Sequence, residues 1–270
     1  MTNHAKKKPT EIVRKPFTQG TPFDGETWKK SAMFFGFLLV VAFLFLLVCS
    51  MTGFDQPILR ILVNLAIISA VLLLFYNNGM NYGTAAVSRG EIIYQKKEKG
   101  SHVSESEVKL CYHPMKGFVP ALLGTVPFLI LALILAFVAE KQTTTQGTLP
   151  SWIQSYLPRD YIGDALKSYT EPEGLSFIGI IRIVVRITLL PYINLAGTSD
   201  YSATLWVERL GPVLELLPAV AYGIGFTRGP MVRTRVHTEI LENTKKRIRR
   251  EKKEKKLRRA AERRGPEQLN

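Results

Sequence analysis

The sequence of 270 residues is poor in the residue types that most catalytic and metal sites use. It contains only two cysteines and four histidines, and the histidines lie far apart along the chain. It has no HExxH, GxSxG, Walker or GxGxxG motif, so no nucleophile is placed beside a base and no glycine-rich loop is available for a phosphate. These absences argue against an enzyme and against a bound cofactor.

The two cysteines lie in very different surroundings. Cys49 ends a long apolar segment, whereas Cys111 lies in a polar loop. One such pair predicts two free thiols rather than a disulfide framework. Cys111-Tyr112-His113 resembles the beginning of a metal site, but no second Cys/His cluster follows it. We therefore expect no metal.

Apolar residues are concentrated in long segments instead of being spread as in a soluble domain. The segments lie at 32–51, 58–76, 119–139, 177–193 and 205–227. A helix needs about 20 predominantly apolar residues, each rising about 1.5 Å, to cross a hydrocarbon core of about 30 Å. The first three segments meet this test outright. The pattern predicts an all-α integral membrane protein.

The excess of positive charge lies entirely in the two ends of the chain. Of the net charge of +14, residues 1–30 carry +4 and residues 228–270 carry +10, while the stretch between them is neutral. Lys and Arg near the ends of spans favour the cytoplasmic side. We therefore expect a multi-pass protein of the cell membrane with cytoplasmic N- and C-termini. Residues 1–30, which contain three prolines, are predicted to be a mostly disordered leader.

The loops between the apolar segments differ in charge. Residues 77–118 carry six Lys/Arg and are expected in the cytoplasm, whereas the acidic stretch 140–204 is expected to form an extracytoplasmic cap. Residues 77–83 (NNGMNYG) are typical of a turn after the second span. SRGEIIYQ and VSESEVKLCYH flank the turn-like KKEKGS, which predicts a small cytoplasmic β-hairpin.

The fourth apolar segment contains two central arginines, Arg182 and Arg186. Its eleven Phe/Ile/Leu/Val residues favour insertion by roughly −3 to −7 kcal/mol, and the arginines oppose it by roughly +5 to +7 kcal/mol. Five spans would also place the basic C-terminal tail outside. We therefore expect an interfacial or partly embedded amphipathic helix at about 177–190 on the outer face, with 205–227 as the fourth span. Five spans is the alternative.

Four charged residues fall in or near the last two apolar segments: Arg182, Arg186, Glu208 and Glu215. Charged residues at membrane depth by default suggest a substrate or ion pathway. The simpler interpretation is a structural set of ion pairs that docks the arginine helix on the fourth span. We favour it because acids and bases balance and no further polar residues line a route.

The C-terminal tail is predicted to form a basic helix, supported by Glu/Lys and Glu/Arg pairs at i, i+4. It has no continuous apolar face. Its candidate contacts with lipid or RNA are Lys245, Lys246, Arg247, Arg249, Arg250, Lys252, Lys253, Lys255, Lys256, Arg258 and Arg259. Contact with an anionic inner leaflet is the favoured interpretation, and contact with ribosomal RNA is the alternative.

The sequence therefore predicts four transmembrane helices, an outer-face amphipathic cap, a small cytoplasmic β-hairpin and a basic helical tail. The expected function is that of a non-enzymatic scaffold, assembly factor or accessory subunit of a membrane complex, with other membrane subunits as partners. Two alternatives remain: a transporter or channel component that uses the Arg/Glu set, and an insertase-like protein whose tail contacts the ribosome. The sequence does not indicate an oligomeric state.

Overall fold

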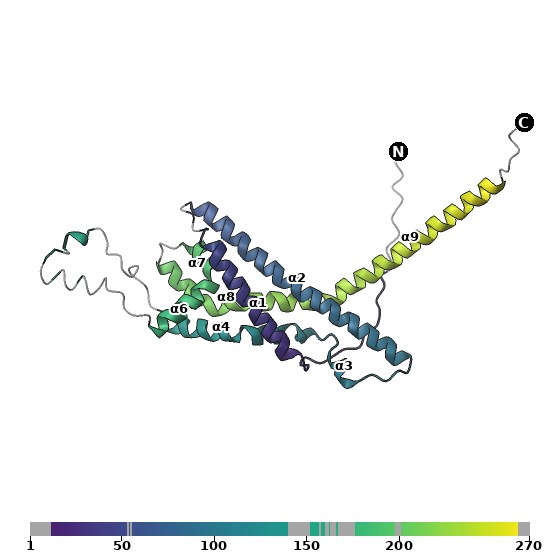
Figure 1. Cartoon of the computed structure of the whole chain (residues 1–270), viewed down its shortest axis with the longest axis horizontal. Coiled ribbons are helices and arrows are strands. Elements are labelled where there is room, and N and C mark those ends of the chain that lie inside the picture. Colours follow the sequence, from purple (N-terminus) through teal and green to yellow (C-terminus); the bar gives the residue numbers. More distant parts are fainter. Residues whose placement is uncertain are drawn as a thin grey trace, which may run out of the picture.

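The computed structural model describes residues 12–52, 54, 56–139, 152–156, 158, 159, 162, 166, 176–197 and 201–263. All regular structure in these residues is helical (Figure 1). The long helices are α1 (Thr27–Cys49), α2 (Pro57–Glu98), α4 (Phe118–Val138), α8 (Tyr201–Thr227) and α9 (Gly229–Arg263). The shorter ones are α3 (Glu105–Lys109), η1 (Pro114–Lys116), η2 (Gln154–Tyr156), α6 (Phe177–Thr188) and α7 (Leu190–Ala196).

Four helices are long and apolar enough to cross a membrane, which confirms the number predicted from the sequence. They are α1, α2, α4 together with η1, and a helix of 59 residues that joins α8 to most of α9. Their shared core is aromatic, with Phe34 of α1 in ring contact with Phe75 of α2 and Tyr222 of α8. Many large apolar side chains on the outside of the bundle are exposed, as expected for helices that face lipid.

Glycines allow α2 and α8 to pack with their backbones in close contact. Gly79 and Gly83 are one helical turn apart on α2, and a Cβ at either position would overlap the carbonyl oxygen of Tyr222 or Phe226. Such small-xxx-small spacing brings membrane helices close together. The prediction of a turn at 77–83 is therefore wrong, because these glycines lie inside a continuous helix and accommodate α8.

The predicted β-hairpin is also wrong. Helix α2 continues to Glu98, and the second half of the expected hairpin contains the short helix α3. Along this part of α2, Val87, Gly90 and Glu91 are buried at helical spacing, against the N-terminal segment and α9. These tertiary contacts outweigh the strand preference of the local sequence, which is a weak determinant by itself.

The N-terminal segment before α1 packs against the helices from residue 12 onward. The N–H of Thr18 donates to the carbonyl of Gly90 (3.1 Å), and that of Gly20 donates to the carbonyl of Tyr112 (2.9 Å). Phe17 contacts the ring of Tyr112 edge-on, and Tyr112 stacks on Phe226. The described part of the predicted disordered leader is thus fixed by specific contacts, and residues 1–11 lie outside the described residues.

Helices α6 and α7 form a broken pair, bent by 84° at Leu189. Arg186 of α6 meets Glu208 in the second turn of α8, and Thr188 reaches Glu215, two turns further along α8. The chain then returns along α7 to the end of the bundle where α1 finishes. There, Asn194 of α7 donates to the carbonyl of Cys49, the last residue of α1. The pair enters and leaves the bundle at the same end. This geometry is that of a re-entrant segment.

Of the two predicted positions of the arginine helix, this arrangement agrees with partial embedding and not with a helix lying flat on the outer surface. Val185 and Leu189 are only 1% exposed, because α6 packs between α1, α4 and α8. The N-terminal segment and α9 lie together at the opposite end, where the N–H of Val13 donates to Thr238 (3.3 Å). The two described ends of the chain therefore lie at the same end of the bundle.

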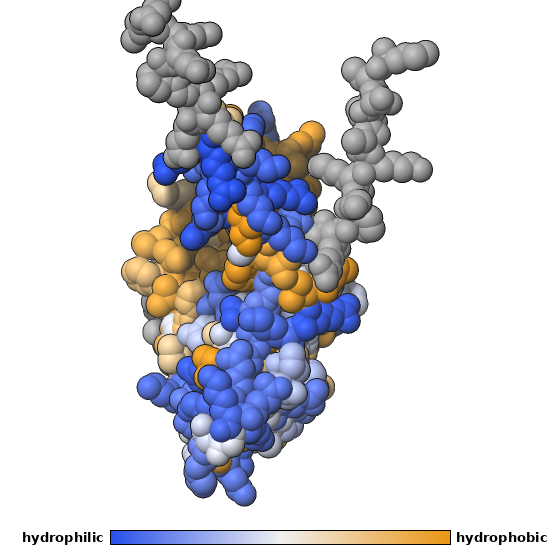
Figure 2. Space-filling view, turned by 90° about the vertical axis from the view of Figure 1, so that its right-hand side faces the viewer, coloured by the Kyte–Doolittle hydropathy of each residue, from blue (hydrophilic) through white to orange (hydrophobic). Residues whose placement is uncertain are grey.

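Helix α9 leaves the bundle as a projecting arm (Figure 1). Its base packs on α2, but every described residue from Asn243 to Ala260 is exposed. Figure 2 looks onto this end of the molecule, where hydrophilic side chains of α9 and of the end of α2 face the viewer and apolar side chains lie behind them.

Candidate functional site

The structure brings together three of the four charged residues predicted from the last two apolar segments. Arg186 Nε lies 2.7 Å and Arg182 Nε 3.4 Å from Glu208 Oε1. The i, i+4 spacing places both arginines on the face of α6 that meets α8. The Glu208 side chain is 2% exposed, whereas those of Arg182 and Arg186 are 17% and 31% exposed. The two guanidinium groups thus neutralise one buried carboxylate.

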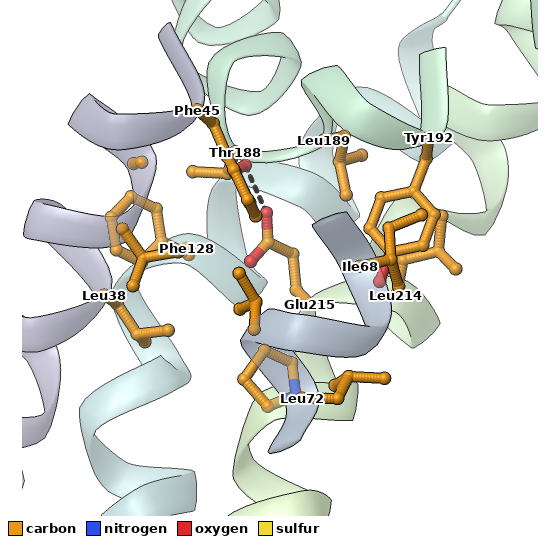
Figure 3. A pocket seen from close by; sticks show the side chains of 14 residues that line it. Leu38, Phe45, Ile68, Leu72, Phe128, Thr188, Leu189, Tyr192, Leu214 and Glu215 are labelled. Atoms are coloured by element: carbon orange, nitrogen blue, oxygen red, sulfur yellow. Dashed lines mark hydrogen bonds between the residues drawn. The ribbon is translucent and has the colours of Figure 1, made fainter. Parts of the chain in front are cut away.

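The fourth residue, Glu215, lies apart from this cluster, about 10 Å further along α8 by helical rise. Its carboxylate accepts a hydrogen bond from the hydroxyl of Thr188, at the end of α6 (Figure 3). Within the described part of the chain, no cation pairs with it. Glu215 is 6% exposed, so it is a buried acid held by a neutral donor.

A small cavity lies beside Glu215, between the re-entrant pair and the spans (Figure 3). Its walls are almost wholly apolar; they include Leu38, Phe45, Ile68, Phe128, Leu189 and Leu214. Its volume of about 40 Å³ suits two or three water molecules, since one water needs at least about 10–15 Å³. The cavity can hydrate Glu215 but cannot hold a sizeable substrate.

A buried polar network that the sequence did not predict ties α7 to the α1–α2 turn. Asn194 Nδ2 donates to the carbonyl of Cys49 (2.7 Å) and contacts the hydroxyl of Thr52 (3.2 Å). Thr52 donates to the side-chain oxygen of Asn64 (3.1 Å), which is fully buried in α2. Two asparagines in otherwise apolar segments were the only sequence signal. Buried amides need such partners, so the network fixes where the re-entrant pair docks.

A second set of buried charges lies at the opposite end of the bundle. Asp24 Oδ2 lies 2.7 Å from Lys116 Nζ and 3.0 Å from Lys30 Nζ. Burial opposes ionisation of Asp24, but hydrogen bonds and charge from the two lysines outweigh it and lower the pKa of Asp24 from 3.8 to about 2. This carboxylate therefore stays charged and joins the N-terminal segment to the start of α4.

A third set of buried charges, around Glu91 of α2, holds the base of α9. The Glu91 carboxylate lies 2.9 Å from Arg233 Nε and 2.7 Å from His237 Nε2. Glu91 and His237 are 5% and 7% exposed. Sequence reasoning missed both of these clusters, because Asp24 lies 92 residues from Lys116 and Glu91 lies 142 residues from Arg233, and no local motif links them.

The predicted contact residues of the tail all lie on the exposed part of α9. Each side chain from Lys245 to Arg259 is exposed, and Arg247 pairs with Glu251 one turn later (2.9 Å). The cations surround the helix on all sides. The structure thus presents them to solvent and leaves their partner open.

The described residues contain no group of three or more His, Cys, Asp or Glu side chains that is placed to hold a metal ion. The fold and the buried charges define a class: a helical bundle with four helices apolar enough to span a membrane and a re-entrant pair. Comparison with known families, with curated proteins and with solved structures gives no match.

Proposed function

We propose that this chain is a non-enzymatic scaffold of the cell membrane that presents a rigid basic arm to a polyanionic partner in the cytoplasm. The single observation that carries the proposal is the course of the last helix. Helix α8 and most of α9 together form a 59-residue helix, Ser202–Ala260, whose final part, from Asn243 onward, stands clear of the bundle. At about 1.5 Å per residue it is far longer than the hydrocarbon core is thick.

The orientation rests on charge. The N-terminal segment and α9 share one end of the bundle, and both carry the excess of Lys and Arg. Positively charged flanks favour the cytoplasmic side, so this end is the inner one and the re-entrant pair enters from outside.

Scaffolding fits the buried charges better than transport does. Glu208 is neutralised by two arginines, and the cavity beside Glu215 has room for only a few water molecules. A transport pathway needs groups that exchange partners and a route that water or substrate can follow. A structural role needs only that the buried carboxylate of Glu208 is compensated, and Arg182 and Arg186 do this.

The partner of the arm is argued from its shape and charge. A helix that lies on a membrane surface needs an apolar face, and α9 has cations on all sides instead. Its exposed part also projects away from the bundle beyond the end of α8 (Figure 1). A dense array of cations without aromatic anchors suits the phosphate backbone of RNA, which is bound mainly by charge. We therefore favour RNA over anionic lipid as the partner of the arm.

The test uses the full chain in nanodiscs of zwitterionic phosphatidylcholine and a fluorescent RNA hairpin, titrated at several salt concentrations. The test variant replaces Lys252, Lys253 and Lys256 with Gln. The matched control replaces Lys97, Lys99 and Lys109, which are exposed at the same end of the bundle, with Gln. We expect the test variant alone to reduce the slope of log affinity against log salt by about 2.

Equal losses in the two variants, or no RNA binding at all, would contradict an RNA-binding arm. A second measurement then places a fluorophore at residue 257. A response of that fluorophore to phosphatidylglycerol in the nanodisc, without any response to RNA, would instead establish that the arm contacts lipid.

A further inference from the structure

A groove with a volume of about 700 Å³ lies at the base of α9. We call it the basal groove. The N-terminal segment, α2 and the first turns of α9 enclose it; its lining includes Ile12, Arg14, Lys15, Glu91, Met231 and Arg233. None of these residues belongs to the Arg182–Glu208 cluster or to the exposed part of the arm.

The groove is positively charged. Arg14 and Lys15 are exposed, and the described residues provide no acidic partner for either of them. Glu91 is the one acid in the lining, and Arg233 and His237 already hold its carboxylate. The free charge that remains in the groove is therefore cationic, which selects an anionic ligand.

The groove lies where the apolar bundle gives way to the charged end. Helix α8 ends at Thr227, and Gly229 packs against the backbone of Gly83 on α2. Met231 and Val87, on the next turns of the two helices, belong to the lining. In a membrane with its inner boundary at the end of α8, this is the depth of the lipid headgroups.

Apolar side chains are exposed beside these cations. Ile12 and Met231 are 67% and 63% exposed at the groove. A soluble phosphate compound would leave both in water, whereas the first acyl carbons of a phospholipid would cover them. Figure 2 shows apolar surface immediately behind the hydrophilic side chains of this end.

We propose that the basal groove binds the phosphate headgroup of an anionic phospholipid of the inner leaflet, with Arg14 and Lys15 as its cationic contacts. Basic pockets beside spans on the cytoplasmic side are suited to such headgroups. The inference rests on the proposed orientation in the membrane, but it does not depend on RNA binding by the arm. A lipid in the groove would join the N-terminal segment to α9 and stabilise the base of the arm.

The experiment is a lipid titration of the detergent-purified full chain, followed by native mass spectrometry. The probes are phosphatidylglycerol, zwitterionic phosphatidylcholine and inorganic phosphate. The test variant is Arg14→Gln with Lys15→Gln, and the control is Lys252→Gln with Lys253→Gln, which removes the same charge from the arm. The four residues are exposed, so we expect both variants to fold as the wild type does.

We expect one phosphatidylglycerol to bind the wild type preferentially, and the test variant to weaken this binding at least about tenfold. The control should change it less than about twofold, because the arm lies beyond the groove. Equal losses in the two variants, or no preference over phosphatidylcholine, would overturn the inference. So would displacement by millimolar inorganic phosphate, which would identify a site for free phosphate instead. Any of these failures leaves the salt-dependent RNA measurement on the arm unaffected.

Discussion

Asp24 and Lys116 form an ion pair with 2.7 Å between carboxylate oxygen and ammonium nitrogen, and their side chains are 1% and 4% exposed. Lys116 Nζ also donates to the carbonyls of Lys109 (2.6 Å) and Cys111 (3.2 Å). One ammonium group therefore fixes both the N-terminal segment and the loop before α4. This end of the bundle is thus held by a buried ion pair as well as by the packing of its helices.

Replacing Asp24 with Asn should destabilise the fold strongly. Loss of one partner leaves the Lys116 ammonium buried without its counter-charge, which costs about 3–5 kcal/mol. The matched control is Glu26→Gln, since Glu26 also pairs with Lys30 (3.1 Å) but is 45% exposed. An exposed pair contributes less than about 1 kcal/mol. Equilibrium unfolding in mixed micelles measures both; equal effects would contradict a buried ion pair.

The same pair predicts how stability depends on pH. The folded pKa of Asp24 is lowered to about 2 from an unfolded value near 3.8. Its contribution is therefore fully present above pH of about 4 and is lost as pH falls through about 2. The difference in stability between wild type and Asp24→Asn should be constant from pH 5 to 7 and shrink below pH 4. A difference that persists unchanged at pH 2.5 would contradict the lowered pKa.

Gly79→Ala should disrupt the contact between α2 and α8. The added methyl group would overlap the carbonyl oxygen of Tyr222, and the backbone of α8 must move to admit it. Overpacking of this kind costs about 1–3 kcal/mol. Gly36→Ala in α1 is the control, because open space surrounds that position. It should be neutral or stabilise by up to about 1 kcal/mol through helix propensity. Equal unfolding midpoints for the two variants would show that the close approach is unimportant.

Two acids of α8 should respond differently to neutral substitution. Glu208→Gln removes the buried carboxylate that Arg182 and Arg186 share and should cost roughly 2–4 kcal/mol. Glu215→Gln retains an oxygen that accepts from Thr188, so its cost should be less than about 1 kcal/mol.

Proton flux into vesicles, followed with a pH-sensitive dye, extends this comparison to function. Scaffolding predicts that wild type and Glu215→Gln give the same flux. A flux that the wild type supports and Glu215→Gln abolishes would favour the transport alternative.

The membrane topology can be measured by labelling single cysteines. Native Cys49 and Cys111 are buried and would be replaced first. With four spans, an impermeant thiol reagent added to intact cells should label a cysteine at Thr198 but not one at Ala261. The reverse pattern would show five spans, place the basic arm outside and remove cytoplasmic RNA as its partner.

The sequence by itself determined which long helices are apolar enough to span a membrane and how charge is distributed along the chain. Whether a segment can cross a membrane depends on its own length and apolar content, and both can be read from the residues of that segment alone. The i, i+4 spacing of Arg182 and Arg186 also fixed them on one face of a helix, whatever the helix packs against.

Only the tertiary structure decided what each of these features contacts. The glycines at 79 and 83 are equally compatible with a turn and with a close helix crossing, and the backbone of α8 selects the crossing. The arginines of α6 face inward because Glu208 is there to receive them. Asp24 and Lys116 pair across 92 residues of chain. A buried charge is stable only beside its partner, and the partner is chosen by packing in space rather than by spacing along the sequence.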